Sequence, residues 1–137
     1  DGARLRRPPA GLGHGAAAMT GPHEILAAWD AGDVPERAAV KDAVKRTLAV
    51  LVEKAPGRAV EVRVPPYAAV QAVGGTTHRR GTPPAVVQCD ARTWLALATG
   101  SLSWSEAVGD GRVRASGERS DLSHLLPLPL PPSGDDG

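Results

Sequence analysis

The sequence predicts a single two-layer α/β (α+β) domain, with helices packed on one face of a mixed, mostly antiparallel sheet of about five strands. The hydrophobic period changes from helical to alternating near Arg58. The run from Ala85 to Ser116 then follows the order strand, helix, helix, strand. The length of 137 residues suits one domain, since domains commonly have about 100 to 150 residues.

Two helices are expected before the first strand. Pro22 at a first helical position predicts a short helix that ends near Gly32 and docks through Trp29. A longer helix begins at Pro35-Glu36 and stops at Pro56-Gly57. Its apolar residues recur at helical spacing and form one stripe: Val40, Val44, Leu48, Leu51 and Val52.

The alternating segment predicts a β-hairpin. One face of its first strand carries three valines, Val60, Val62 and Val64. Glu61 and Arg63 point to the other, solvated face. Pro65-Pro66 cannot donate ladder hydrogen bonds, so they form the connection, and 67–73 is the returning strand. The charged segment 76–80 is expected to form a short edge strand.

The run from Ala85 to Ser116 carries the clearest local signals. After a strand at 85–89, Asp90 is an N-cap and Gly100 closes the helix at the left-handed C-cap position. Ser103 and Glu106 form a capping box for a second short helix. The expected inward stripe of that helix is Trp104, Ala107 and Val108, and 112–116 is the last strand.

The two ends of the chain are expected to lie outside the folded domain at 21–128. Residues 1–20 are expected to be flexible, because Gly, Ala, Arg and Pro dominate 1–18 without periodicity. Met19 followed by Thr20 suits a natural start. Ser120 predicts a final helix through Leu126, and 129–137 reads as a Pro-rich disordered tail.

Composition excludes several classes of partner. The net charge is +1, from 16 basic and 15 acidic residues, so no long-range field steers the chain to nucleic acid or an anionic membrane. No apolar run approaches the roughly 18 residues of a membrane span, so stable membrane insertion is not expected. The single cysteine suits a reducing compartment, and we expect a cytoplasmic protein.

Catalytic and metal-binding chemistry find little support. No pair of the four histidines has metal-ligand spacing, so neither a metal nor another cofactor is expected. Cys89 and His78 could form a nucleophile–base pair, but a cysteine that ends an apolar strand is more often a small buried hydrophobe. We therefore expect no enzyme. The best polar candidates, as contacts for a ligand head group, are His78, Arg79 and Arg80.

A set of apolar, capping and glycine positions resembles a known family. The set is Asp90, Trp94, Leu97, Gly100, Leu102, Ala107, Gly111, Val113 and Gly117. Its pattern resembles the sterol carrier protein superfamily over 36–128, and the whole chain resembles the small stand-alone actinobacterial members. The resemblance implies a five-stranded sheet whose helices can enclose a tunnel for sterols, fatty acids or acyl-CoA esters.

Such a tunnel would be lined by apolar side chains of the sheet and helices. The candidates are Val60, Val62, Val64, Val86, Trp94, Leu97, Leu102, Trp104, Leu122, Leu125 and Leu126. An ordinary core would use the same residues. An empty apolar pocket of about 300 Å³ would cost about 7 kcal/mol, which rivals the stability of a small domain. A pocket must therefore be filled by a ligand, hold water, or collapse.

Two functions fit the sequence. The first is a non-enzymatic carrier for a hydrophobic small molecule, held between sheet and helices. The alternative is an accessory or interaction domain without a cavity, because domains resembling this one also occur appended to mycothiol-dependent isomerase-like enzymes. A protein partner and a monomeric or weakly dimeric state fit either function.

Overall fold

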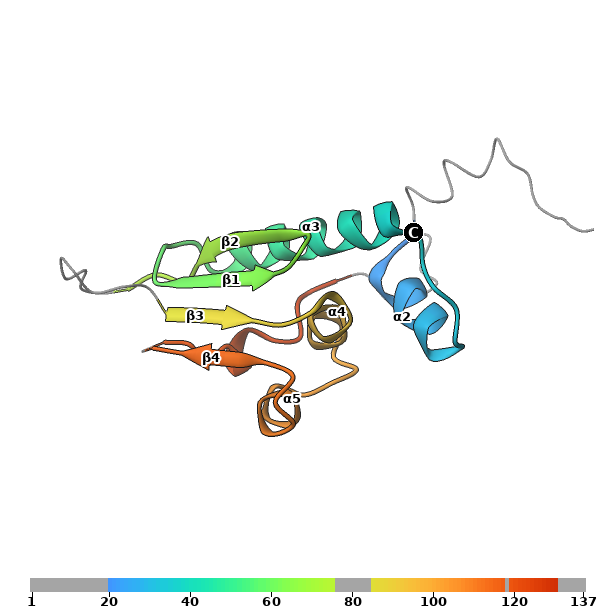
Figure 1. Cartoon of the computed structure of the whole chain (residues 1–137). Coiled ribbons are helices and arrows are strands. Elements are labelled where there is room, and N and C mark those ends of the chain that lie inside the picture. The colour runs from blue at the N-terminus through green and yellow to red at the C-terminus, as the bar shows by residue number, and fades with distance from the viewer. Residues whose placement is uncertain (1–19, 76–84, 118, 131–137) are drawn as a thin grey trace, which may run out of the picture.

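The computed structural model describes residues 20–75, 85–117 and 119–130. Helices pack against a four-stranded sheet with the strand order β2-β1-β3-β4 (Figure 1). The elements are α2 (Pro22–Asp30), α3 (Arg37–Lys54), β1 (Val60–Val64), β2 (Ala68–Ala72), β3 (Ala85–Gln88), α4 (Ala91–Thr99), α5 (Trp104–Gly109), β4 (Arg114–Ser116) and the 3₁₀ turn η1 (Ser123–Leu125).

The sheet is mixed, as predicted. β1 pairs antiparallel with β2 and parallel with β3, and β3 pairs antiparallel with β4. The described residues form four strands where about five were expected, and the predicted edge strand at 76–80 lies outside the described residues. The α+β fold class is confirmed.

The two faces of the sheet differ in chemistry. Val60, Val62 and Val64 are fully buried on the face toward the helices, as their spacing predicted. The parallel register pairs Val62 with Val87, which is also buried. Glu61 and Arg63 lie on the opposite, solvated face, where they form a 3.1 Å ion pair. The hydrophobic core therefore lies on one side of the sheet.

Helix α3 supplies the longest wall of the core. Val40, Val44, Leu48 and Leu51 are buried as predicted, while Val52 is half-buried at the margin of the stripe. Helix α2 packs on α3 and α4 and buries two of its side chains, Ile25 and Leu26.

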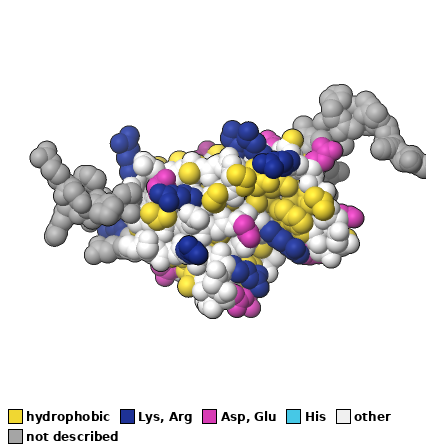
Figure 2. All heavy atoms as spheres, in the orientation of Figure 1, with side chains coloured by type: hydrophobic (Ala, Val, Ile, Leu, Met, Phe, Trp, Pro, Cys, Tyr) yellow, Lys and Arg dark blue, Asp and Glu magenta, His cyan; other side chains and the backbone are white. Residues whose placement is uncertain are grey.

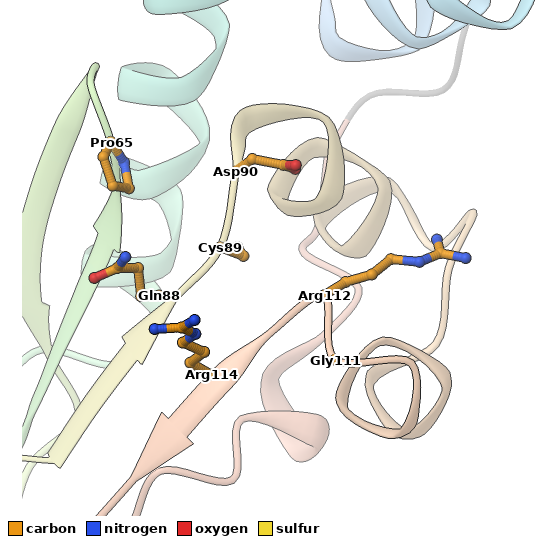
Figure 3. A pocket seen from close by; sticks show the side chains of 7 residues that line it. All are labelled: Pro65, Gln88, Cys89, Asp90, Gly111, Arg112 and Arg114. Carbon is orange, nitrogen blue, oxygen red and sulfur yellow. The ribbon is translucent and has the colours of Figure 1, made fainter.

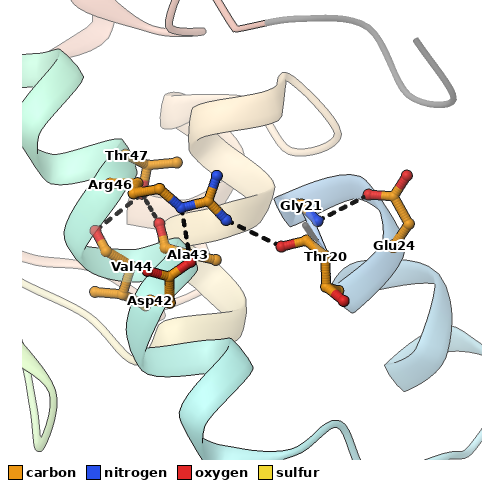
Figure 4. A network of polar contacts seen from close by, with 8 residues as sticks. All are labelled: Thr20, Gly21, Glu24, Asp42, Ala43, Val44, Arg46 and Thr47. Atoms are coloured by element: carbon orange, nitrogen blue, oxygen red, sulfur yellow. Dashed lines mark hydrogen bonds and ion pairs between the residues drawn. The ribbon is translucent and has the colours of Figure 1, made fainter. Parts of the chain in front are cut away.

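A polar contact ties the start of α2 to α3. The Arg46 guanidinium donates to the carbonyl of Thr20 at 3.0 Å and pairs with Asp42 at 2.7 Å (Figure 4). The Glu24 carboxylate in turn accepts from the Gly21 N–H at 3.2 Å. These bonds hold the first turn of α2 against the longest helix.

The predicted caps of α4 and α5 are confirmed. The Asp90 carboxylate accepts from the Thr93 N–H at 2.8 Å, and Gly100 adopts φ 90°. Ser103 and Glu106 form the capping box. The predicted inward position of Val108 is wrong: its side chain is 41% exposed, because Ala107 alone fills the buried position of this six-residue helix.

The predicted helix from Ser120 to Leu126 is also wrong. Only the 3₁₀ turn η1 forms there, because the Asp121 carboxylate accepts from the Ser123 N–H at 2.9 Å and starts a local turn. Leu126 is extended, as the residue before a proline prefers. The chain then crosses α4, where the Leu128 N–H donates to the Ala98 carbonyl at 2.9 Å.

Candidate functional site

Trp94 lies at the centre of the core. Its side chain is 1% exposed, and its indole Nε1–H donates to the Thr47 hydroxyl at 2.8 Å. That hydroxyl in turn donates to the Ala43 carbonyl at 2.8 Å, one turn earlier on α3 (Figure 4). The indole is thus packed and its polar atom is satisfied, so it joins α4 to α3 and fills the space beneath the sheet.

The predicted tunnel residues fall into two groups. Most of them are buried in one shared core: Val60, Val62, Val64, Trp94, Leu97, Leu122 and Leu125. Leu102, Trp104 and Leu126 are half-buried at its margin. The buried group is packed together as an ordinary core of the domain.

Val86 requires a correction. The parallel register pairs it with Glu61, so it lies on the solvated face of the sheet and is half-buried. Its neighbour Val87 occupies the core position instead. A shift of one residue along a strand moves a side chain to the other face, and local composition alone does not set that phase.

Two hollows open on the surface at one end of the sheet. The smaller, of about 290 Å³, is lined by Pro65, Gln88, Cys89, Asp90, Gly111, Arg112 and Arg114 (Figure 3). The larger, of about 710 Å³, is lined by Leu26, Asp30, Asp90, Arg92, Thr93, Ala96, Ser101, Leu102, Gly111 and Arg112. Asp90, Gly111 and Arg112 line both, so the hollows are adjacent, and we call the two together the α4 groove.

The topology explains why a groove forms here. β1 and β3 are parallel, so their carboxyl ends meet at the same edge, where Pro65 and Asp90 follow the strands. At such an edge the chain turns away from the sheet and leaves a crevice. The connection from α5 to β4 borders the crevice on one side, and α2 borders its larger part.

The larger hollow combines apolar and charged walls. Leu26, Ala96 and Leu102 supply its apolar side chains. Figure 2 shows hydrophobic side chains gathered on the face where α2 and α4 lie in Figure 1, with charged side chains beside them. A surface of this kind suits a ligand that has both apolar and polar parts.

Most of the charges around the groove already have partners. Arg92 pairs with Asp30 at 2.8 Å and stacks 5.8 Å from the centre of the Trp29 ring. Arg112 pairs with Asp110 at 3.0 Å. The Arg114 guanidinium, by contrast, has no hydrogen-bond or ion-pair partner within the described part of the chain.

Cys89 lies at the base of the smaller hollow but is only 5% exposed. Burial raises the pKa of its thiol from 9.0 to about 12, and the negative charge of Asp90 adds to the rise. The thiolate is the nucleophilic form of cysteine. At neutral pH this side chain is therefore a small buried hydrophobe, as its position at the end of an apolar strand predicted.

The raised pKa predicts a pH dependence of stability. The unfolded thiol ionises above pH 9, whereas the folded thiol stays protonated to about pH 12. The unfolded chain then binds fewer protons, so the free energy of unfolding should fall between these pH values by about 1.4 kcal/mol per pH unit from this group. Urea titrations at pH 8 to 11 measure the free energy of unfolding of the wild-type protein and of Cys89→Ala. Its slope against pH should be more negative for the wild-type protein than for the variant. Equal slopes would contradict burial of the thiol.

The structure does not describe the remaining polar candidates from the sequence. His78, Arg79 and Arg80 lie outside the described residues. Within residues 20–75, 85–117 and 119–130, no group of three or more His, Cys, Asp or Glu side chains is placed to hold a metal ion. In the same ranges, no helix is both long and apolar enough to cross a membrane.

Sequence reasoning missed the α4 groove. The sequence indicates Asp90 as an N-cap and places Arg112 and Arg114 in the last strand, but nothing in their spacing brings them to one hollow. The missing information was which strands are parallel, because that choice brings the ends of β1 and β3 together.

The fold defines the protein as a two-layer α+β domain, and its sheet and helices agree with a sterol-carrier-like fold. Residues 36–128 match the model of the family described as bacterial SCP ortholog, and the chain belongs to this family. No curated protein matches the chain. Helix α2 precedes the matched range, yet it contributes Leu26 and Asp30 to the larger hollow.

Proposed function

We propose that the protein is a non-enzymatic binding or carrier module for a hydrophobic small molecule of the sterol, fatty acid or acyl-CoA class. Family membership supports a ligand of this kind. The observation that carries the proposal is the α4 groove, whose larger hollow of about 710 Å³ is within the range of about 300 to 1,000 Å³ typical of small-molecule sites.

The proposal places the ligand in the groove and not between the sheet and the helices. Trp94 and the valines of β1 are fully packed, and a void of about 300 Å³ among them would cost about 7 kcal/mol. The groove is open to ligand without that cost. Leu102 is half-buried at its wall and offers an apolar surface beside the polar rim.

The buried, protonated state of the Cys89 thiol argues against this residue, the single cysteine of the chain, as a nucleophile. A nucleophile would need access to its substrate and a thiolate near neutral pH. If the protein shows any catalytic activity and a Cys89→Ser variant retains it in full, that result would argue further against a catalytic thiol.

Saturable binding tests the proposal. We expect native mass spectrometry and displacement of a fluorescent fatty acid to show one bound ligand per chain. Leu102→Ser should weaken that binding about tenfold, because the substitution removes one leucine side chain from the apolar wall. Val108→Ser is the matched control, because Val108 is 41% exposed and does not line the groove.

Circular dichroism of both variants separates loss of binding from loss of fold. No saturable binding of sterols, fatty acids or acyl-CoA by the wild-type protein would overturn the proposal. Equal weakening by the Leu102 and Val108 substitutions would place the ligand elsewhere.

A second candidate function is an accessory domain for a separate mycothiol-dependent isomerase-like enzyme. The filled core favours it, because an interaction domain needs no cavity, and Val34 between α2 and α3 is 89% exposed. Co-elution of the two proteins should then depend on Val34, and Val34→Asp should abolish it. If the protein elutes separately from such an enzyme when the two are mixed, this function is ruled out.

A further inference from the structure

We infer that the smaller hollow of the α4 groove binds the anionic group of the ligand, and that Arg114 and Gln88 are the residues that recognise it. The inference rests on the proposed function for the apolar part of the ligand. It adds a chemical class: an amphiphile that carries a carboxylate or phosphate.

The geometry of β3 and β4 brings the two side chains together. Gln88 and Arg114 are direct cross-strand partners on the solvated face of the sheet. Figure 3 shows the Arg114 guanidinium next to the Gln88 amide, over the end of β3. A guanidinium fork with an amide donor beside it matches the paired oxygens of a carboxylate or phosphate.

Arg114 differs from the arginines around it in having no acceptor within the described residues. Arg63 belongs to the same row across the sheet, beyond Gln88, but pairs with Glu61 at 3.1 Å. Arg112 pairs with Asp110 at 3.0 Å. The hydrogen-bonding capacity of Arg114 is therefore available to a ligand.

The charge of the lining also favours an anion. Arg112, Arg114 and Asp90 line the smaller hollow, but the Arg112 guanidinium points away from Arg114 (Figure 3) and pairs with Asp110 at 3.0 Å, so among the described residues of the lining Arg114 supplies the unpaired cation. The Asp90 carboxylate accepts from the Thr93 N–H at 2.8 Å, so it is directed to the first turn of α4. Figure 3 shows that Asp90 and Arg114 point away from each other.

The adjacency of the two hollows suggests the shape of the ligand. The smaller hollow borders the larger one at Asp90, Gly111 and Arg112, which line both. An anionic group held at Arg114 thus leaves the rest of the molecule free to extend toward the apolar wall formed by Leu26, Ala96 and Leu102. A neutral amphiphile can use that wall but gains nothing from Arg114.

The test compares decyl phosphate with 1-decanol, which share the alkyl chain and differ in charge. Isothermal titration calorimetry below the micellar concentration should give tighter binding of decyl phosphate. Arg114→Gln should weaken decyl phosphate about tenfold, the effect of one charge-assisted contact, and leave 1-decanol unchanged. Arg63→Gln is the matched control, since it removes the same charge two strands away and does not line the hollow.

The outcomes separate this inference from the proposed function. Equal affinities of the wild-type protein for both compounds would overturn anion recognition and leave the binding module intact. If the Arg114 and Arg63 substitutions weaken decyl phosphate binding equally, the effect comes from the net charge of the protein. That result would overturn the assignment of Arg114 as the anion contact. If inorganic phosphate binds as tightly as decyl phosphate, the claim that the ligand is an amphiphile would be overturned. Failure of both alkyl compounds to bind would overturn the inference, whereas the proposed function depends on the displacement of the fluorescent fatty acid.

Discussion

Replacement of Trp94 by alanine should lower the free energy of unfolding by about 3 to 5 kcal/mol, as measured by urea denaturation followed by circular dichroism. The indole is 1% exposed and is packed in the core that α4 shares with α3 and the sheet. Its removal leaves a cavity and also breaks the hydrogen bond between Nε1 and the Thr47 hydroxyl at 2.8 Å. This loss would be a large share of the stability of a small domain.

Trp94→Phe is the matched control for the size of the side chain. It keeps an aromatic ring and removes the hydrogen bond to Thr47, so a smaller loss of about 1 to 2 kcal/mol is expected. A loss below about 1 kcal/mol for Trp94→Ala would contradict an indole that is both packed and hydrogen-bonded in the core.

Gly57→Ala should be the most damaging glycine substitution, with a loss of roughly 3 kcal/mol or more in the same measurement. Gly57 has φ 147°, and a Cβ atom there would clash with the backbone of Val73. The two segments cannot move apart easily, because two hydrogen bonds join them. The Ala59 N–H donates to the Val73 carbonyl at 2.8 Å, and the Val73 N–H donates to the Ala55 carbonyl at 2.7 Å.

Gly109→Ala provides the comparison for Gly57. Gly109 is the last residue of α5, and a Cβ atom there would meet nothing within 4 Å. Alanine should be neutral or stabilise the protein by up to about 1 kcal/mol at this position. Equal effects of the two substitutions would refute the close approach between the segments that contain Gly57 and Val73.

Local chemistry made much of the fold predictable. The carboxylate of Asp90, the hydroxyl of Ser103 and the left-handed Gly100 act within a few residues of their own positions, so the sequence contains all that is needed to place α4 and α5. The alternation of Val60, Val62 and Val64 likewise places β1, because one face of that strand is buried.

The errors came from competing local bonds and from long-range pairing. Ser120 is a good N-cap residue, but the Asp121 carboxylate forms the turn that prevails. The face of Val86 depends on its register with Glu61, a residue 25 positions earlier in the chain. The α4 groove depends on the same parallel pairing and on α2, so no spacing within one segment could reveal it.

The central claim is that ligand binds in the α4 groove while the core stays filled. The most direct test is a titration of isotope-labelled protein with decyl phosphate, followed by NMR chemical shifts of backbone amides and of the Trp94 indole. We predict shifts at Ala96, Leu102 and Gly111, with the Trp94 indole N–H and the Val62 amide unchanged. Large shifts of the Trp94 indole and of Val62 with none at Leu102 and Gly111 would place the ligand between sheet and helices and contradict the claim.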